Sequence, residues 1–269
     1  MMSAPSGSIH PTAIVAPGAR LEEGVRIGPY CVVGATCTLE RGVTLMSHVV
    51  VEGVTTLGAE TQVWPFASLG SPPQDVKYRG EPSRLLIGPR NRIREHVTIN
   101  PGTVGGGMET RIGADGLFMV GVHIAHDCKI GDRVIMANNA TLGGHVVVGD
   151  CAVIGGLVAV HQFVRIGAHA MIGGMSGVDR DVIPYGSVAG ERARLCGLNA
   201  VGLQRRDFSR QQIGALREAY QALFGEAADA PLSARIAAVA QRFAAEEVVM
   251  DVIRFLQEPS SRGLTKLGQ

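Results

Sequence analysis

Four histidines and one aspartate in the central part of the sequence could carry acid–base or metal chemistry: His123, His126, Asp127, His145 and His161. Histidine titrates near neutral pH, and an adjacent carboxylate can orient its ring, so the pair His126–Asp127 suits a general base. A backbone N–H group beside such a base could stabilise an oxyanion. The sequence therefore predicts base-catalysed chemistry, provided that the fold brings these residues together.

Two other interpretations use the same side chains. Imidazole is a common zinc ligand, so the histidines could form a metal site. They could also line a solvated corner without a chemical role. Glycines expected next to the pair His126–Asp127 favour the general base, and we assign no metal site from the sequence.

The element that must position these residues is a repeat with a step of six. Every sixth residue from Ile112 to Val178 is large and apolar, and the same holds from Ile9 to Leu69 and from Ile87 to Ile99. A helix would place apolar residues every three or four positions, and a strand every two. A step of six is typical of hexapeptide repeats, whose short strands wind into a parallel β-helix.

A second column of small or medium-sized residues lies four positions after each large one. A large inward residue beside a small corner residue would let each coil close without voids. Cys31, Cys37 and Cys128 belong to this column, and the sequence contains no Cys-x-x-Cys pair. We therefore expect buried free thiols rather than disulfides.

The repeat predicts which distant residues meet. Three strands of six residues make one coil, so residues eighteen apart should stack about 4.8 Å apart. The stacks expected around the histidines are Ala125–Gly143–His161, His126–Gly144–Gln162 and Asp127–His145. The polar residues should therefore converge on one edge of the β-helix across successive coils.

The repeats divide the chain into three parts. Residues 1–8 are expected to form a disordered leader, residues 9–190 the β-helix and residues 191–269 a C-terminal helical domain. The step of six is interrupted at 70–86 and 100–111, which predicts two loops. Loops that leave a rigid scaffold often carry function.

Helix signals appear only after the repeats. Ser209 and Gln212 form a capping box at the start of an amphipathic segment over 209–223, and Gly225 follows its end. Two further helices are expected over 233–243 and 246–256. A helical domain in this position would cover the open edges of the last coil.

Composition excludes several classes of protein. The formal net charge is +1 at pH 7, so no general nucleic-acid surface is expected. The first eight residues lack the charged and apolar regions of a signal peptide. No apolar run reaches the roughly 18 residues of a membrane span. We expect a cytoplasmic protein without a transmembrane segment.

Residues 9–206 resemble the UDP-N-acetylglucosamine O-acyltransferases that begin lipid A biosynthesis, which are left-handed β-helix proteins. Other hexapeptide acyltransferases share the repeat but lack this set of motifs. The motifs that carry the resemblance are Ile-His-Pro-Thr-Ala-Ile-Val at 9–15, Gln-Asp-Val-Lys-Tyr-Arg-Gly-Glu-Pro at 74–82, Asn-Arg-Ile-Arg-Glu at 91–95, His-Ile-Ala-His-Asp-Cys at 123–128, Ala-Asn-Asn-Ala-Thr-Leu at 137–142 and Ala-Val-His-Gln-Phe at 159–163. The left hand of the β-helix is implied by this resemblance alone.

The resemblance implies a reaction and partners. The donor would be a 3-hydroxyacyl chain on the phosphopantetheine of acyl carrier protein, and the acceptor the 3-hydroxyl of UDP-N-acetylglucosamine, with no further cofactor. His126 would be the general base, Asp127 would orient it, and the Gly144 N–H would face the oxyanion. The family is a homotrimer with sites between neighbouring subunits.

The resemblance also implies residues that bind substrate. In the first loop these residues are Gln74, Asp75 and Lys77. Along the sugar-phosphate and acyl groove they are His123, His145, His161 and Gln162. At the nucleotide end they are Asn199, Arg205 and Arg206. Ala170, Met171 and Gly174 would set the length of the acyl chain, and glycine at 174 predicts a chain longer than ten carbons. This sequence departs from the family at Val201, where an acidic residue is expected, and at Arg192, where histidine is expected.

Three alternatives share the scaffold. The related N-acyltransferase of the same pathway carries an extra N-terminal uridine-binding domain, whereas the repeats here begin at Ile9. A coenzyme A-dependent acetyl- or succinyltransferase would release coenzyme A instead of acyl carrier protein. A metal-dependent hydratase or a plain scaffold would belong to a different class, which metal analysis would distinguish.

Overall fold

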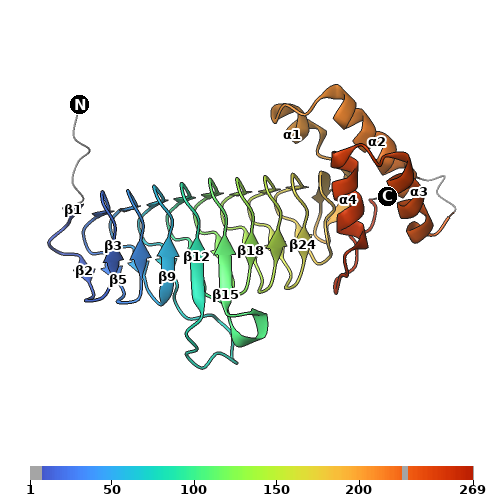
Figure 1. Ribbon diagram of the computed structural model, residues 1–269. Helices are drawn as coiled ribbons and strands as arrows, with labels where there is room; N and C mark the ends of the chain where they lie inside the picture. The colour runs from blue at the N-terminus through green and yellow to red at the C-terminus, as the bar shows by residue number, and fades with distance from the viewer. Residues whose placement is uncertain (1–7, 226–229, 269) are drawn as a thin grey trace.

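The computed structural model describes residues 8–225 and 230–268. The chain winds into a long left-handed parallel β-helix, and helices fold against its C-terminal end (Figure 1). Most of the predicted leader lies outside the described residues. Its last residue, Ser8, differs from the prediction, because it belongs to the first strand of the β-helix.

The described strands form three sheets, which are the three faces of a prism. Sheet 1 contains β1 (Ser8–Ile9), β4 (Arg26–Ile27), β7 (Thr44–Leu45), β10 (Gln62–Val63), β13 (Arg92–Ile93), β16 (Leu117–Phe118), β19 (Ile135–Met136), β22 (Val153–Ile154), β25 (Met171–Ile172), β27 (Gly186–Ala189) and β28 (Arg194–Leu198). Sheet 2 contains β2 (Ile14–Val15), β5 (Val32–Val33), β8 (Val50–Val51), β11 (Ser68–Leu69), β14 (Thr98–Ile99), β17 (His123–Ile124), β20 (Thr141–Leu142), β23 (Ala159–Val160) and β26 (Gly177–Val178). Sheet 3 contains β3 (Arg20–Leu21), β6 (Thr38–Leu39), β9 (Val54–Leu57), β12 (Arg84–Ile87), β15 (Glu109–Ile112), β18 (Lys129–Ile130), β21 (Val147–Val148) and β24 (Arg165–Ile166).

The step of eighteen is confirmed where no loop intervenes. His123 pairs with Thr141 and Thr141 with Ala159, each eighteen residues on. The inward residue of each strand is buried, and Phe118, Met136 and Leu142 are fully enclosed. Burying each such side chain contributes roughly 1.5–3 kcal/mol, so the apolar column determines the register of every coil.

The cysteine prediction is also confirmed. Cys31, Cys37 and Cys128 are buried in the corner column, and all five cysteines are free thiols. Burial raises the pKa of the Cys128 thiol to about 12, so this side chain stays protonated at neutral pH.

Both loops leave the same edge of the prism, between sheets 2 and 3. The first loop follows β11 and ends at β12, and the second follows β14 and ends at β15 (Figure 1). The loops are shorter than predicted, because residues 84–86 and 109–111 extend these two strands. The second loop contains a short 3₁₀ turn, η1 (Val104–Gly106).

The C-terminal end differs from the prediction in its first residues. β28 pairs antiparallel with β27, so residues 194–198 extend sheet 1 instead of belonging to the helical domain. The helices are α1 (Ala200–Arg205), α2 (Arg210–Phe224), α3 (Leu232–Arg242) and α4 (Glu247–Gln257). The last three correspond to the predicted helices, and the Ser209–Gln212 capping box is present. Among the described helices, none has the length and apolar character to cross a membrane.

Candidate functional site

The edge that carries the two loops also carries the central histidines. His126 and Asp127 form the corner between β17 and β18, one coil above the second loop. His145 and Phe163 take the position of Asp127 on the next two coils. All three have positive φ, 62°, 62° and 65°, a conformation that costs a non-glycine residue about 1–2 kcal/mol. The sharp corner therefore stacks these side chains along one line.

Asp127 is held from two directions. Its buried carboxylate accepts hydrogen bonds from the Thr103 backbone N–H at 2.8 Å and from the Thr103 hydroxyl at 2.6 Å. Its own backbone N–H donates to the Thr110 hydroxyl at 2.8 Å. Thr103 belongs to the second loop and Thr110 to β15, which follows that loop, so the loop and the strand after it together fix the aspartate.

A glycine permits this contact. A Cβ atom on Gly106 would lie 1.9 Å from the carboxyl carbon of Asp127, which is much closer than atoms can approach. The η1 turn therefore packs its bare backbone against the carboxylate. This explains why the second loop has glycine at 106, in the run Gly105-Gly106-Gly107.

His126 is bound to this fixed carboxylate. The distance between its Nδ1 and the Asp127 Oδ2 is 2.7 Å, and both side chains are largely shielded from solvent. A buried carboxylate that already accepts from Thr103 favours the tautomer with the proton on Nδ1. The lone pair on Nε2 is then available to accept a proton.

The Nε2 atom lies against Gly144. A Cβ on Gly144 would come within 2.7 Å of Nε2 and 2.5 Å of Cε1. The Gly144 backbone N–H donates no hydrogen bond to any described residue. Gly144 therefore lies directly against the His126 ring, as predicted from the step of eighteen.

Two further histidines of this edge, His145 and His123, have pKa values below the ordinary histidine value. His145 Nε2 lies 3.8 Å from the Asp127 Oδ2, and its ring stacks on Phe163 with 4.3 Å between centroids. Burial lowers the pKa of His145, and the charge of Asp127 opposes this only in part. His123 bonds to the Thr98 hydroxyl at 2.7 Å, and burial and the neighbouring His126 lower its pKa.

Donor atoms of His126, Asp127 and His145 lie within 4.8 Å of one another, which would allow a metal ion to be bound. Hydrogen bonds already explain this cluster, however. The Asp127 Oδ2 accepts from both Thr103 and His126. A metal at this carboxylate would have to replace the bond that orients the His126 ring, so the geometry suits an acid–base pair better.

The first loop reaches the same edge. The charges of Asp75 and Lys77 influence the pKa of His145 in opposite directions, the aspartate raising it and the lysine lowering it. Gln74 is exposed on this loop. His161 and Gln162 are exposed two coils above His126. The structure therefore places Asp75 and Lys77 of the first loop close enough to the histidine edge for their charges to act on His145.

The predicted nucleotide residues lie elsewhere. Asn199, Arg205 and Arg206 line a cavity of about 700 Å³ on the outer face of sheet 1, together with Val153 and Met171. Sheet 1 is the face of the prism opposite the edge between sheets 2 and 3. Within one chain, these residues are separated from His126 by the body of the β-helix.

The predicted acyl-length residues are also not on the histidine edge. Ala170 points inward and is fully buried, Met171 lies on the face of sheet 1, and Gly174 is exposed at the corner between sheets 1 and 2. Within one subunit, a straight path up the histidine edge therefore does not lead from His126 to Gly174. The two positions are not separated by a multiple of eighteen, so they fall on different edges.

The sequence did not indicate several residues of the site. Thr103, Gly106 and Thr110 hold Asp127, and Phe163 packs on His145. The broken repeat at 100–111 located the segment but not its contacts. For Phe163 a signal was available, since it lies eighteen residues after His145.

Comparison with known proteins gives a consistent result. A sequence profile described as "Udp N-acetylglucosamine O-acyltransferase; Domain 2" matches residues 181–265. The chain is 52% identical over 257 residues to the acyl-[acyl-carrier-protein]–UDP-N-acetylglucosamine O-acyltransferase of Caulobacter vibrioides, covering 96% of this chain and 97% of that protein.

Comparison with solved structures points to the same family as the sequence comparison. A crystal structure of a UDP-N-acetylglucosamine acyltransferase has a TM-score of 0.93 and 42% identity, covering 97% of this chain and 100% of that one. The UDP-N-acetylglucosamine acyltransferase of Campylobacter jejuni has a TM-score of 0.90 and 36% identity, covering 97% and 100%. The chain therefore belongs to the family of acyl-[acyl-carrier-protein]–UDP-N-acetylglucosamine O-acyltransferases.

Proposed function

We propose that this chain transfers a 3-hydroxyacyl group from acyl carrier protein to the 3-hydroxyl of UDP-N-acetylglucosamine, the first step of lipid A biosynthesis, with His126 as general base. One observation carries the proposal. His126 is bound through Nδ1 to an Asp127 carboxylate that Thr103 holds in place, and its Nε2 lies beside Gly144, whose N–H donates to none of the described residues.

The chemistry follows from this arrangement. His126 Nε2 accepts the proton of the sugar 3-hydroxyl while the oxygen forms a bond to the thioester carbonyl carbon. The negative charge then develops on the carbonyl oxygen, where the Gly144 N–H can donate to it. The carbon–sulfur bond breaks, and the leaving thiolate takes the proton back from Nε2. Neither a covalent enzyme intermediate nor a cofactor is required, since the site has only to hold donor and acceptor together.

We further propose that the site is completed by a second subunit of a homotrimer. Arg205 and Arg206, whose guanidinium groups suit a diphosphate, lie on the face opposite His126. In the acceptor about five bonds separate the reacting 3-hydroxyl from the first phosphorus, which is roughly 6 Å. A sugar nucleotide of this length cannot reach from His126 around the β-helix to the arginines of the same chain. In this proposal, the arginines therefore come from a neighbouring subunit.

The activity is tested by incubating the purified protein with UDP-N-acetylglucosamine and a series of 3-hydroxyacyl-acyl carrier proteins. Mass spectrometry should detect an O-acylated sugar nucleotide and free acyl carrier protein thiol. Turnover with acyl-coenzyme A but not with acyl carrier protein would instead favour the coenzyme A-dependent alternative.

The shared site is tested by mixing two inactive variants, His126→Ala and Arg206→Ala, after joint unfolding and refolding. Mixed trimers should regain activity, because some sites combine an intact His126 with an intact Arg206. A mixture that stays as inactive as its components would refute the shared site.

A further inference from the structure

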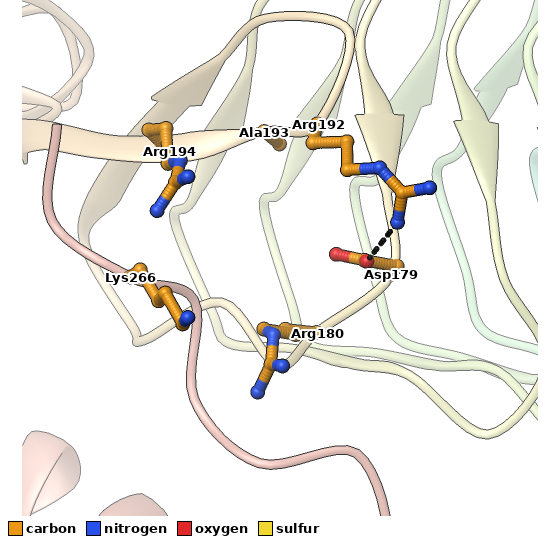
Figure 2. Close-up of a pocket in the computed structure, with 6 residues that line it drawn as sticks. All are labelled: Asp179, Arg180, Arg192, Ala193, Arg194 and Lys266. Carbon is orange, nitrogen blue, oxygen red and sulfur yellow. Dashed lines mark hydrogen bonds and ion pairs between the residues drawn. The ribbon is translucent and has the colours of Figure 1, made fainter.

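The C-terminal tail, residues 260–268, returns from α4 to the end of the β-helix. Figure 2 shows its Lys266 lining a small pocket together with Arg180, which follows the last strand of sheet 2. The Asp181 backbone N–H donates to the Gly263 carbonyl at 2.9 Å, and the Thr265 hydroxyl donates to the Asp181 carbonyl at 2.8 Å. The tail is therefore fixed to the coil that follows the last histidine.

The histidine edge changes where it meets this tail. Asp127, His145 and Phe163 occupy equivalent corners of successive coils, each with positive φ. The next residue in the step of eighteen is Asp181, which lacks positive φ. Its buried carboxylate accepts from the backbone N–H of Arg165 at 2.9 Å and from the guanidinium of Arg165 at 2.8 Å. Asp181 is thus bound to Arg165 instead of continuing the stacked column.

Arg262 of the tail takes the vacated place above Phe163. Its guanidinium carbon lies over the Phe163 ring, 5.9 Å from the centroid, which is within the range of a cation–π interaction. His145 stacks on the same ring, with 4.3 Å between centroids and 5° between planes. Because His145 belongs to the coil below and the tail to the coil above, the phenyl ring lies between an imidazole and a guanidinium.

Arg262 also holds the backbone of this corner. Its Nε donates to the Gln162 carbonyl at 2.7 Å, and the Phe163 backbone N–H donates to the Gly144 carbonyl at 3.1 Å. The carbonyl and the N–H belong to the same peptide group. One peptide therefore joins Arg262 to Gly144, the residue that lies against the His126 ring.

The lower end of the stacked column reaches the proposed base. The His145 ring meets the His126 ring edge to face, with 5.1 Å between centroids. The His145 Nε2 lies 3.8 Å from the Asp127 Oδ2, and its backbone N–H donates to the His126 carbonyl at 3.0 Å. A shift of the His145 ring would therefore remove the packing that the pair His126–Asp127 has on the side of the next coil.

The tail itself holds Arg262 in place. The Ser260 hydroxyl accepts hydrogen bonds from the backbone N–H groups of Arg262 and Gly263, at 3.1 and 2.9 Å. The Arg262 side chain is partly buried. A residue in a turn that is fixed in this way can restrain the corner that it contacts.

We propose that Arg262 is a positioning residue for the transfer reaction, which fixes the Gln162–Phe163 corner and through it holds Gly144 and His145 against His126. The inference rests on the proposed function, because that function makes His126 the base. Phe163 and His145 separate Arg262 from His126 in the column, so Arg262 acts on the site and not on the reacting atoms.

Steady-state kinetics of the full-length protein test the role. Arg262→Gln should lower kcat about fivefold, as expected for the loss of a cation over an aromatic ring, while the KM values for both substrates stay within twofold. Arg262→Lys keeps a cation and should retain at least half of the wild-type kcat. The matched control Arg217→Gln, at an exposed position on α2, should behave as wild type. An unchanged kcat in Arg262→Gln, with or without a higher KM, would overturn the proposal.

A double-mutant cycle tests whether Arg262 acts through Phe163. Phe163→Leu should also lower kcat about fivefold, since leucine cannot stack on His145. In Arg262→Gln/Phe163→Leu the total loss should be less than half the product of the two single losses, because both changes loosen the same corner. A total loss within twofold of that product would mean that the residues act independently, which contradicts the proposal.

NMR titration of His145 provides a readout that needs no substrate. Burial lowers the pKa of His145, so a loosened Phe163 ring should let this pKa rise toward the ordinary value of about 6.5 in both Arg262→Gln and Phe163→Leu. The charged and titratable groups that face His145 are unchanged in both variants: Asp127, His126, Asp75 and Lys77.

A His145 pKa that stays at its wild-type value in both variants would show that Arg262 does not control this corner. If the wild type transferred no acyl group from any donor, the proposed function would fail. The titration of His145 would then still decide whether Arg262 positions the histidine edge.

Discussion

Thr103 binds the Asp127 carboxylate twice, through its backbone N–H to Oδ1 and through its hydroxyl to Oδ2, at 2.8 and 2.6 Å. The loop that breaks the hexapeptide repeat is therefore part of the machinery that orients His126. Thr103→Val keeps the backbone bond but removes the hydroxyl, so Asp127 is less firmly held. We expect kcat to fall about tenfold, or 1.4 kcal/mol in barrier, with both KM values unchanged.

Thr103→Ser provides the control, since it keeps the hydroxyl and should retain most of the rate. Steady-state kinetics with both substrates varied would measure the effect. A valine variant with wild-type kcat would show that the hydroxyl does not contribute to positioning.

Gly144→Ala tests the contact between the base and the coil above it. The added Cβ would approach the His126 ring to 2.5 Å, so the ring must move away from its productive position. Displacing a catalytic group by about 1 Å can cost 10²-fold in rate, and we expect a loss of that order in kcat. Gly214→Ala in α2, where a Cβ meets no atom within 4 Å, should leave kcat unchanged. Equal activity of the two variants would contradict the proposed geometry.

Gly174 and Ala170 are expected to respond differently to enlargement. Gly174 is exposed at its corner, where a side chain could shorten the groove that the proposed homotrimer would form between subunits. Gly174→Met should shift donor preference to shorter acyl chains, because each excluded methylene forfeits about 0.8 kcal/mol. Ala170 is fully buried, so Ala170→Val should lower the free energy of unfolding by about 1–3 kcal/mol without changing chain preference. Competition between donors of different length would measure the preference, and an unchanged order in Gly174→Met would exclude the length role.

The pKa values of His123, His145 and His169 are all lowered by burial in the folded state. The unfolded chain then binds protons more readily than the folded one below the ordinary histidine pKa of about 6.5. Their contribution to stability is complete above that pH and is lost as the pH falls through it toward the lower folded values. The free energy of unfolding, measured with urea, should be smaller at pH 5.5 than at pH 7.5. His169→Gln should reduce the difference; equal stability at both pH values would contradict these pKa directions.

The sequence predicted the β-helix because its signal is local and strictly periodic. Each inward residue is large, so a step of six and a coil of eighteen follow without any knowledge of distant contacts. The same arithmetic placed Gly144 above His126 and His145 above Asp127. The contacts that the loops make could not be predicted from the sequence. The hydrogen bonds from Thr103 to Asp127, for example, depend on the η1 turn and not on a repeat.

Other errors have equally specific causes. Gly174 lies on another edge than His126, because its offset from that residue is not a multiple of eighteen. Residues 194–198 were expected in the helical domain because the step of six ends at Val178. The chain instead continues as the hairpin of β27 and β28 before α1 begins.

The central claim is that His126 removes the proton of the acceptor hydroxyl. His126→Ala should lower kcat for the acyl carrier protein reaction by about 10²–10⁴-fold. The circular dichroism spectrum should not change, because the apolar columns are untouched and Thr103 still satisfies Asp127. His10→Ala, at an exposed histidine far from the site, should keep the wild-type rate. A folded His126→Ala variant that transfers the acyl chain at nearly the rate of His10→Ala would contradict the assignment.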